Sequence, residues 1–242
     1  MRRRIFEDFP DREIIQLPQS IWFQSPSGVE DMARRIGRMK RFTLITRESA
    51  SESFARRHFP CPVTLCPDLA LWLDPADFQI PPADLDRFGL LRLDREAPPD
   101  SLRDLEQIDF PHQDWLIPGP EVDRWRLAAR LFLRFDAWLA PLFLNHALTA
   151  RRLFQMALPG YERLALLRAQ RGVRFLCRGR ILVTNRLHGH LLGLLTGRPQ
   201  VITDTLNGKI RAFYESWTHL HPSVHWAENL IEARKIADRL SR

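Results

Sequence analysis

Two basic turns in the C-terminal half of the chain carry the residue types needed to bind an anion and to transfer a proton. Arg186 and His188 follow the apolar run 181–184, and Lys209 and Arg211 come after the next apolar run along the chain. Arginine and lysine bind phosphate and carboxylate groups, and histidine can gain or lose a proton near neutral pH. The chemistry expected here is therefore proton transfer on an anionic substrate.

The elements around both turns determine whether these side chains meet. Each turn follows a predicted strand and precedes a predicted helix, and α/β proteins bind ligands at this edge of a parallel sheet. The first turn of such a helix presents unpaired N–H groups and the positive end of its dipole. Asn207 and Gly208 permit left-handed backbone geometry, which can form an anion-binding nest. One alternative stays open: Arg186 forms a structural ion pair, and His188 caps its helix.

The first 73 residues alternate between strand and helix patterns. Strands are expected at 13–17 and 42–46 and within 61–73, and helices at 26–41 and 47–59. This alternation predicts parallel strands joined by crossover helices, an α/β layer. The Pro- and Asp-rich stretch 74–89 has no long periodic pattern, so it is the predicted domain boundary.

The second half continues the α/β pattern. Strands are predicted at 90–96, 114–117, within 173–185 and at 200–204, and helices at 121–143, 147–171, 186–196, 210–217 and 227–240. The helix at 121–143 is amphipathic, with basic residues between apolar ones. Residues 1–82 and 83–242 are therefore the predicted domains, and the last helix could pack back on the first of them.

Composition and charge narrow the class of partner. The 242 residues carry a net charge of +7, and lysine occurs only at positions 40, 209 and 235. Basic residues are interspersed with carboxylates and form no face of basic and aromatic residues, which argues against a nucleic-acid partner. An anionic small substrate or an anionic membrane surface fits the charge equally well. The chain shows no secretory signal pattern and no apolar run near the ~20 residues of a membrane span, so a cytoplasmic location is expected.

Five segments, in order and at matching spacing, resemble the polysaccharide pyruvyl transferases. They are "IIQLPQSIWF" (14–23), "LITRESASESFARRHF" (44–59), "VTLCPDLALWL" (63–73), "LLRLDRE" (90–96) and "LVTNRLHGHLLGLLTGRPQVITDTLNGKIRAFYESWT" (182–218). The last one resembles the C-terminal signature of the family. The resemblance covers nearly the whole chain.

The resemblance implies a glycosyltransferase-B-like fold, in which two Rossmann-type domains with parallel sheets face a cleft. Family members normally open with a Gly-rich strand and turn before the "LPQS" segment, whereas this chain has no glycine before Gly28. The resemblance therefore implies an incomplete N-terminal domain. Residues 1–82 would be its remainder, and residues 83–242 would form the donor-binding domain.

The family's activity, implied by the same resemblance, is transfer of pyruvate from phosphoenolpyruvate to sugar hydroxyls of an exopolysaccharide or cell-wall glycan precursor. The acceptor would be lipid-linked or nucleotide-linked, and the enzyme could associate with membrane-bound polysaccharide assembly machinery at the inner face of the membrane. No cofactor and no metal are required, and no clustered ligand spacing suggests one.

Roles for individual residues follow from the matched motifs. His188 matches the family's R-L-H histidine and is the expected general acid/base, and Arg47 matches an arginine from the other domain, unless it only pairs with Glu48 or Glu52. The residues expected to bind the donor phosphate and carboxylate are Arg186, Lys209, Arg211, Asn207 and Gly208. Asp94 could contact the acceptor sugar or cap a turn, and His190 is expected to be structural.

The sequence is also compatible with two other functions. A nucleotide-sugar glycosyltransferase of the same fold would carry an acidic residue for the ribose and would be indifferent to phosphoenolpyruvate. A non-catalytic remnant would only bind a glycan or a partner enzyme.

Overall fold

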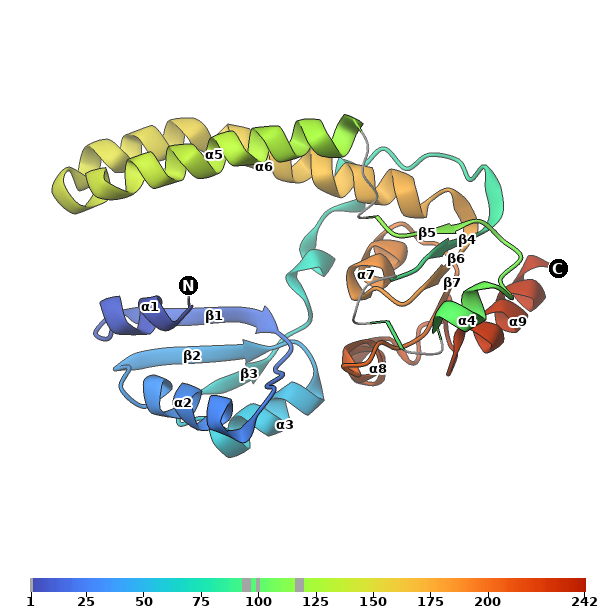
Figure 1. Cartoon of the computed structure of the whole chain (residues 1–242), viewed down its shortest axis with the longest axis horizontal. Coiled ribbons are helices and arrows are strands. Elements are labelled where there is room, and N and C mark those ends of the chain that lie inside the picture. Colours follow the sequence, from blue (N-terminus) through green and yellow to red (C-terminus); the bar gives the residue numbers. More distant parts are fainter. Residues whose placement is uncertain (1, 93–96, 99–100, 116–119) are drawn as a thin grey trace.

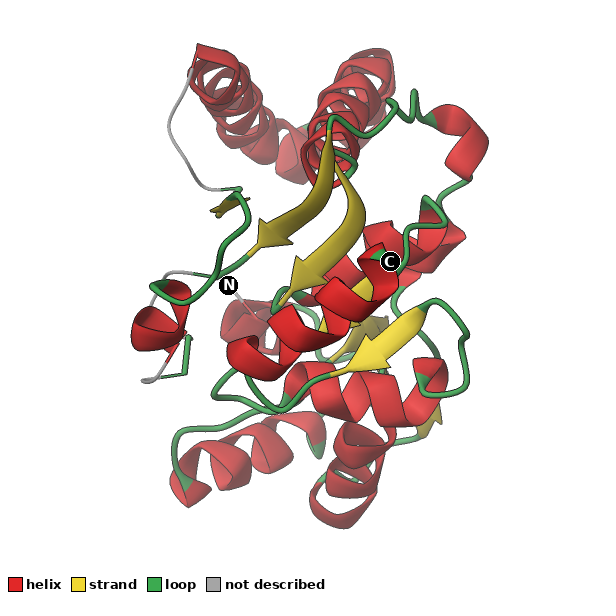
Figure 2. Cartoon of the chain, turned by 90° about the vertical axis from the view of Figure 1, so that its right-hand side faces the viewer, coloured by secondary structure: helices red, strands yellow, loops and turns green. Residues whose placement is uncertain are grey.

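The computed structural model describes residues 2–92, 97–98, 101–115 and 120–242, and contains two parallel β-sheets flanked by helices (Figures 1 and 2). The first sheet has the order β1-β2-β3, with β1 Glu13–Gln19, β2 Arg41–Thr46 and β3 Val63–Leu65. The second has the order β5-β4-β6-β7-β8, with β4 Leu85–Leu90, β5 His112–Gln113, β6 Gly179–Thr184, β7 Gln200–Ile202 and β8 Val224–Trp226. Every pair of neighbouring strands is parallel, so the predicted α/β class with parallel strands is confirmed.

Helices α1 (Arg2–Asp8), α2 (Pro26–Ile36) and α3 (Ser49–His58) accompany the first sheet. Ser25 caps α2, since its hydroxyl accepts a hydrogen bond from the backbone N–H of Gly28. The helix ends at Ile36 rather than at the predicted residue 41, because Gly37 follows it and β2 already begins at Arg41. The hydrophobic core of this half lies between the sheet and helices α2 and α3. It consists of Ile36, Phe42, Leu44, Ala55, Phe59 and Val63.

The second sheet is covered on both faces, and successive residues of β6 point to opposite sides. Ile181 and Val183 pack with Ala233 of α9 (Leu230–Ser241), whereas Leu182 packs on the other side with the end of α6. Helix α9 therefore belongs to the second sheet, and the prediction that the last helix packs back on the first domain is wrong. The remaining helices of this half are α4 (Ser101–Leu105), α7 (Leu187–Leu195) and α8 (Lys209–Phe213), the last of which runs into a π-helical turn, η3 (Tyr214–Thr218).

A long helical hairpin connects β5 to β6. It consists of α5 (Pro120–Asn145) and α6 (Ala147–Leu176) and projects away from the second sheet (Figure 1). The hairpin is anchored at its base, where Val173 and Leu176 pack against Phe88 and Leu182. Within the described ranges, no helix has the length and apolar character needed to cross a bilayer.

Three predicted boundaries shift. The strand expected at 90–96 lies at Leu85–Leu90 instead. The charged residues at 85–90 can be part of a strand because they have partners elsewhere in the fold; Arg87, for example, bonds Asp238 of α9. The strand expected within 173–185 begins only at Gly179, because α6 continues through the β-forming residues Val173 and Phe175. The short strand expected at 114–117 lies at His112–Gln113, and residues 93–96 and 116–119 lie outside the described residues.

The connection between the two sheets carries two short 3₁₀ turns, η1 (Leu69–Trp72) and η2 (Pro75–Asp77). Each is capped by an aspartate, Asp68 or Asp74, that accepts a backbone hydrogen bond from two residues further on. Helix α7 packs against η1, and α3 packs against α8. The carboxyl ends of β2 and β3 are thereby held beside the first turns of α7 and α8.

Candidate active site

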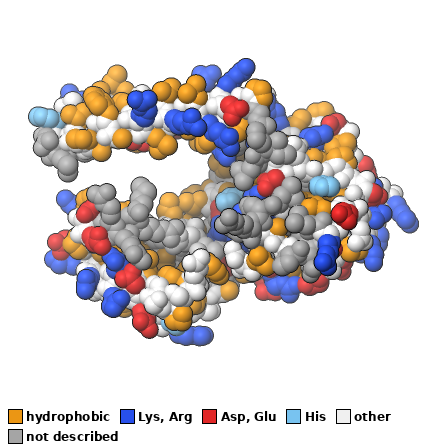
Figure 3. All heavy atoms as spheres, in the orientation of Figure 1, with side chains coloured by type: hydrophobic (Ala, Val, Ile, Leu, Met, Phe, Trp, Pro, Cys, Tyr) orange, Lys and Arg blue, Asp and Glu red, His pale blue; other side chains and the backbone are white. Residues whose placement is uncertain are grey.

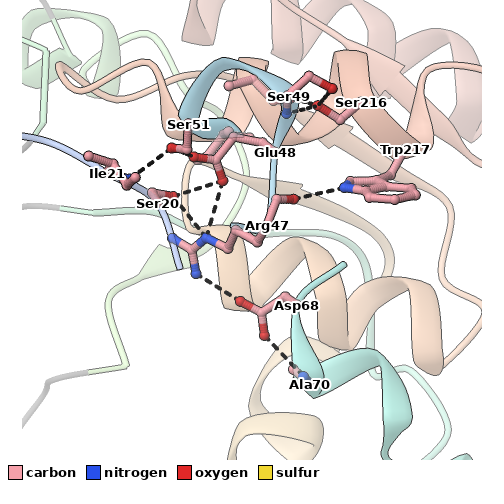
Figure 4. A network of polar contacts seen from close by, with 12 residues as sticks. Ser20, Ile21, Arg47, Glu48, Ser49, Ser51, Asp68, Ala70, Ser216 and Trp217 are labelled. Carbon is pink, nitrogen blue, oxygen red and sulfur yellow. Dashed lines mark hydrogen bonds and ion pairs between the residues drawn. The ribbon is translucent and has the colours of Figure 1, made fainter. Parts of the chain in front are cut away.

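Arg47 lies just beyond the end of β2, and its guanidinium joins several polar groups of the first half of the chain (Figure 4). Its Nε donates to Ser20 Oγ at 2.8 Å, and its Nη1 donates to Asp68 Oδ2 at 2.7 Å. Both side chains of the Arg47–Asp68 pair are largely buried, with 14% and 10% exposed. Because a buried ion pair with a hydrogen bond is costly to break, this pair fixes the position of the guanidinium.

Glu48 forms the other side of this network. Its carboxylate is buried and accepts hydrogen bonds from the hydroxyls of Ser20 (3.0 Å) and Ser51. Arg47 Nε lies 3.5 Å from Glu48 Oε2. The predicted ion pair between Arg47 and Glu48 is therefore present, but Arg47 also pairs with Asp68. Glu52 pairs with Arg56 instead. The network therefore supplies Arg47 with two acidic neighbours, Glu48 and Asp68.

His188 lies in the first turn of α7, close to Asp68. Its Nε2 is 4.0 Å from Asp68 Oδ2, and its side chain is 58% exposed. The pKa of His188 is lowered, chiefly by partial loss of hydration; Asp68 opposes the shift, while the positive charges of Arg47 and Lys209 add to it. The ring is thus biased toward the neutral form and is electrostatically coupled to all three charged neighbours.

An open hollow of about 400 Å³ adjoins these groups. Its lining includes Arg47 from the first half of the chain and Asn207, Gly208 and Lys209 from the second half. Gly208 has the left-handed conformation that its sequence context predicts, with φ of +64°. Four of the predicted site residues, which come from both halves of the chain, therefore meet at one hollow.

Backbone N–H groups on either side of Asn207 and Gly208 bond a carboxylate of the chain itself. Asp204 Oδ1 accepts hydrogen bonds from the backbone N–H groups of Thr205 (2.8 Å) and Ile210 (3.3 Å). Burial raises the pKa of Asp204, while these hydrogen bonds oppose the shift. The predicted nest residues, Asn207 and Gly208, line the hollow, and the N–H of Gly208 donates to the carbonyl of Thr205 at 3.1 Å, so the anion-binding nest stays a prediction.

Two of the predicted anion-binding arginines are engaged elsewhere. Arg186 is buried, forms an ion pair with Asp114 and lies over the ring of Trp115 at 5.7 Å. The ion pair that the structural alternative predicts for Arg186 is therefore present, since a buried guanidinium needs a carboxylate to offset its lost hydration. Arg211 pairs with Glu228 and lies 4.7 Å over the ring of Trp226. Neither arginine lines the hollow.

Two predicted residues, His190 and Asp94, lie away from the hollow or outside the described residues. His190 is structural, as expected: it is fully buried, with its Nδ1 2.9 Å from Gln200 Oε1 and its Nε2 3.1 Å from Thr218 Oγ1. Burial lowers the pKa of His190 to about 4. Asp94 lies outside the described residues.

Two polar contacts tie the halves of the chain together beside the hollow (Figure 4). The indole N–H of Trp217 donates to the backbone carbonyl of Arg47 at 2.8 Å, and the backbone N–H of Ser49 donates to Ser216 Oγ at 3.0 Å. Arg47 is therefore held by its side chain to the first sheet and by its main chain to the π-helical turn η3.

Sequence reasoning missed Asp68 and Ser20 as members of the site, and it considered Glu48 only as an ion-pair partner of Arg47. Asp68 follows the strand at 63–65, just as Arg47 follows β2, so the rule that parallel strands end at one edge could have placed it there. Ser20 carries no such signal, since its role depends on its contact with Glu48 at the start of α3. Among the described residues, no group of three or more His, Cys, Asp or Glu side chains is arranged to hold a metal ion.

Comparison with known proteins points to one family. The sequence model of the polysaccharide pyruvyl transferase family matches residues 1–206. "Pyruvyl transferase 1" of Schizosaccharomyces pombe is 25% identical over 232 residues, which cover 90% of this chain and 50% of that protein. "Putative pyruvyl transferase EpsO" of Bacillus subtilis is 27% identical over 224 residues, or 92% of this chain and 65% of that protein. The chain thus spans between half and two thirds of the length of these relatives.

A solved structure supports the fold. A protein of Klebsiella pneumoniae without an assigned function superposes with a TM-score of 0.51 at 15% sequence identity, and the match covers 89% of this chain and 63% of the other. At this identity the likeness concerns the fold alone.

Proposed function

Because the chain belongs to the polysaccharide pyruvyl transferase family, we propose that it transfers pyruvate from phosphoenolpyruvate to sugar hydroxyls of an exopolysaccharide or cell-wall glycan precursor. One observation carries the proposal: Arg47 and Lys209 line one hollow, and Arg47 pairs with Asp68, whose carboxylate lies 4.0 Å from His188, so that residues from four separate segments are neighbours. This cluster combines cations for an anionic donor with a group that can carry a proton.

The two sheets correspond, in this proposal, to two Rossmann-type domains of a glycosyltransferase-B-like enzyme, residues 1–82 and 83–242. The donor would lie between the end of β2 and the starts of α7 and α8, with the acceptor on a lipid or nucleotide carrier in the cytoplasm. Contacts from both sides to one ligand would fix the two halves against each other.

Lys209 and Arg47 are the cations we assign to the donor. Lys209 offers a point charge with three donors, which suits a phosphate, and Arg47 offers a planar fork, which suits a carboxylate or phosphate. Arg47 already bonds a carboxylate, that of Asp68. A bound donor would compete with Asp68 for the same guanidinium.

The reaction forms two carbon–oxygen bonds and releases phosphate. One acceptor hydroxyl oxygen bonds to C2 of the donor while a proton is added to C3, and a second hydroxyl oxygen then displaces the phosphate, which leaves a cyclic ketal. Of the two hydroxyl protons, one is balanced by the new methyl group and the other departs with the phosphate.

His188 is the group we assign to the proton addition. Its pKa is lowered in the free protein, and a nearby phosphate and carboxylate would raise it, because opposite charge stabilises the imidazolium. Protonation of His188 would thus follow donor binding, so the acid would be charged only when its substrate is present.

Thermal unfolding with and without donor tests the assignment. At about ten times Kd, phosphoenolpyruvate should stabilise the fold by about 1.4 kcal/mol, which raises Tm by roughly 3–6 °C for a chain of this size. Lys209→Gln should reduce that shift, while Lys235→Gln on α9 serves as the matched control. No shift would contradict the donor assignment, and a shift with nucleotide sugars alone would favour a glycosyltransferase.

A further inference from the structure

The helical hairpin α5–α6 concentrates the positive charge of the chain. Between residues 120 and 176 it carries ten arginines and four carboxylates, a net charge of +6 out of +7 for the whole chain. Nine of those arginines are exposed, at positions 124, 126, 130, 134, 151, 152, 163, 168 and 174. The rest of the molecule is therefore nearly neutral, and the hairpin is its basic element.

The same hairpin leaves large apolar side chains exposed. Leu127, Leu131 and Trp138 are each 59% exposed and recur at spacings of four and seven residues, which puts them on one stripe of α5. Across the turn, Leu148 and Met156 of α6 are 78% and 79% exposed. The space-filling view shows apolar and basic side chains mixed over the hairpin, with open space between it and the first sheet (Figure 3).

Charge and apolar surface are arranged along the hairpin axis. The 14 residues 137–150, which form its far end, include no Asp, Glu, Lys or Arg. Arg134 and the pair Arg151 and Arg152 flank this segment. An uncharged end bordered by arginines suits insertion among acyl chains with the guanidinium groups at the level of the headgroups.

A basic hollow lies nearer the base of the hairpin. It is lined by Arg124, Arg168, Arg171 and Arg174 together with Trp125, and Leu167 connects it to the exposed apolar surface. The guanidinium of Arg168 lies 4.1 Å above the ring of Trp125. Its pKa is lowered by burial and by the charges of Arg171 and Arg126, so an anion in this hollow would relieve repulsion among the arginines.

We propose that the α5–α6 hairpin docks the protein on an anionic phospholipid bilayer, with the apolar end inserted at the interface and the arginine hollow against the lipid phosphates. The helices are held to each other by their own contacts, such as Tyr161 with Asp136 and Phe132, so the exposed stripe remains available to the bilayer. Binding in the plane of the interface needs no membrane-spanning segment.

Vesicle co-sedimentation tests the proposal. The protein should bind vesicles of equimolar phosphatidylcholine and phosphatidylglycerol and should not bind phosphatidylcholine alone. Binding should fall as salt rises from about 0.1 M to about 1 M, since the screening length shortens from about 10 Å to about 3 Å.

Three triple variants separate charge from apolar insertion. Replacing Arg124, Arg130 and Arg134 by glutamine should weaken binding roughly fivefold per arginine, about a hundredfold in total. The matched control replaces Arg38, Arg57 and Arg239, which are exposed outside the hairpin, and should change binding by less than about threefold because these charges lie away from the docking surface. Replacing Leu127, Leu131 and Trp138 by glutamine should weaken binding more than about tenfold.

Three results would overturn the proposal. The first is no binding to anionic vesicles by a protein whose circular dichroism shows it folded. The second is an equal loss in the hairpin and control arginine variants, which would mean that net charge alone is responsible. The third is a protein that does not bind vesicles and is a dimer in light scattering, with the apolar variant monomeric. The exposed stripe would then be covered by a second copy of the chain.

Discussion

His190 makes a prediction about acid stability that the structure allows to be worked in numbers. An unfolded histidine has a pKa near 6.5, while burial lowers the pKa of His190 to about 4. As pH falls below 6.5, His190 is protonated in the unfolded chain but stays neutral in the native state. The free energy of unfolding therefore declines with falling pH until about pH 4. At about 1.36 kcal/mol per pKa unit, the loss between pH 7 and pH 4.5 is about 2–3 kcal/mol.

A matched variant isolates this residue from the carboxylates that titrate in the same range. His190→Asn removes the titrating ring and retains a donor where Nδ1 bonds Gln200. The variant should be less stable than the parent at pH 7, because Thr218 loses its partner. That deficit should shrink by about 2–3 kcal/mol at pH 4.5.

Urea unfolding at both pH values measures the two free energies. If the difference between parent and variant is the same at pH 7 and pH 4.5, His190 is not held neutral by burial. The result matters for the site, because His190 fixes α7 to β7 and to η3, and α7 presents His188.

Three further predictions concern residues of the candidate site. His188→Gln should lower kcat for pyruvate transfer by about 10²–10⁴ with a smaller effect on donor affinity, the usual share of acid–base catalysis; a variant as fast as the parent would remove His188 from the chemistry. Arg47→Lys should cost both stability and turnover, since a point charge cannot serve Ser20 and Asp68 together, and unchanged turnover would make Arg47 structural. Gly208→Ala should destabilise by about 1 kcal/mol because φ is +64°, measured by urea unfolding, and an unchanged midpoint would contradict a requirement for glycine.

The fold was predictable where periodicity and burial agree. The strands β1, β2 and β6 carry apolar residues that are buried in parallel sheets, and their positions follow from that pattern. Strand β4 was misplaced because Asp84, Asp86 and Arg87 make its start look like a loop, and only long-range partners such as Asp238 explain those charges. Strand β8, Val224–Trp226, was missed because three residues give no period.

The sequence predicted at which edge of the sheet the site lies, but not which carboxylates pair with its cationic residues. The rule that loops after parallel strands meet predicted that His188 and Lys209 lie at one edge of the second sheet. Arg47 was predicted from the family motif alone, and its charge acts on His188 together with that of Lys209. It could not say that Arg186 would pair with Asp114 or that Arg211 would pair with Glu228, because those carboxylates lie 72 and 17 residues away in the chain. The cations available to a substrate depend on which of them the protein's own carboxylates already engage. That pairing is set by the tertiary fold and cannot be derived from sequence spacing.

The scarcity of lysine gives the hollow a chemical handle. Lys40 pairs with Asp11 at the far end of the first sheet, and Lys235 lies on α9. Of the three lysines in the chain, therefore, Lys209 alone lines the hollow. An amine-selective reagent can modify at most these three side chains and the chain's amino terminus, so protection of one peptide by a ligand would map occupancy of the hollow directly by mass spectrometry.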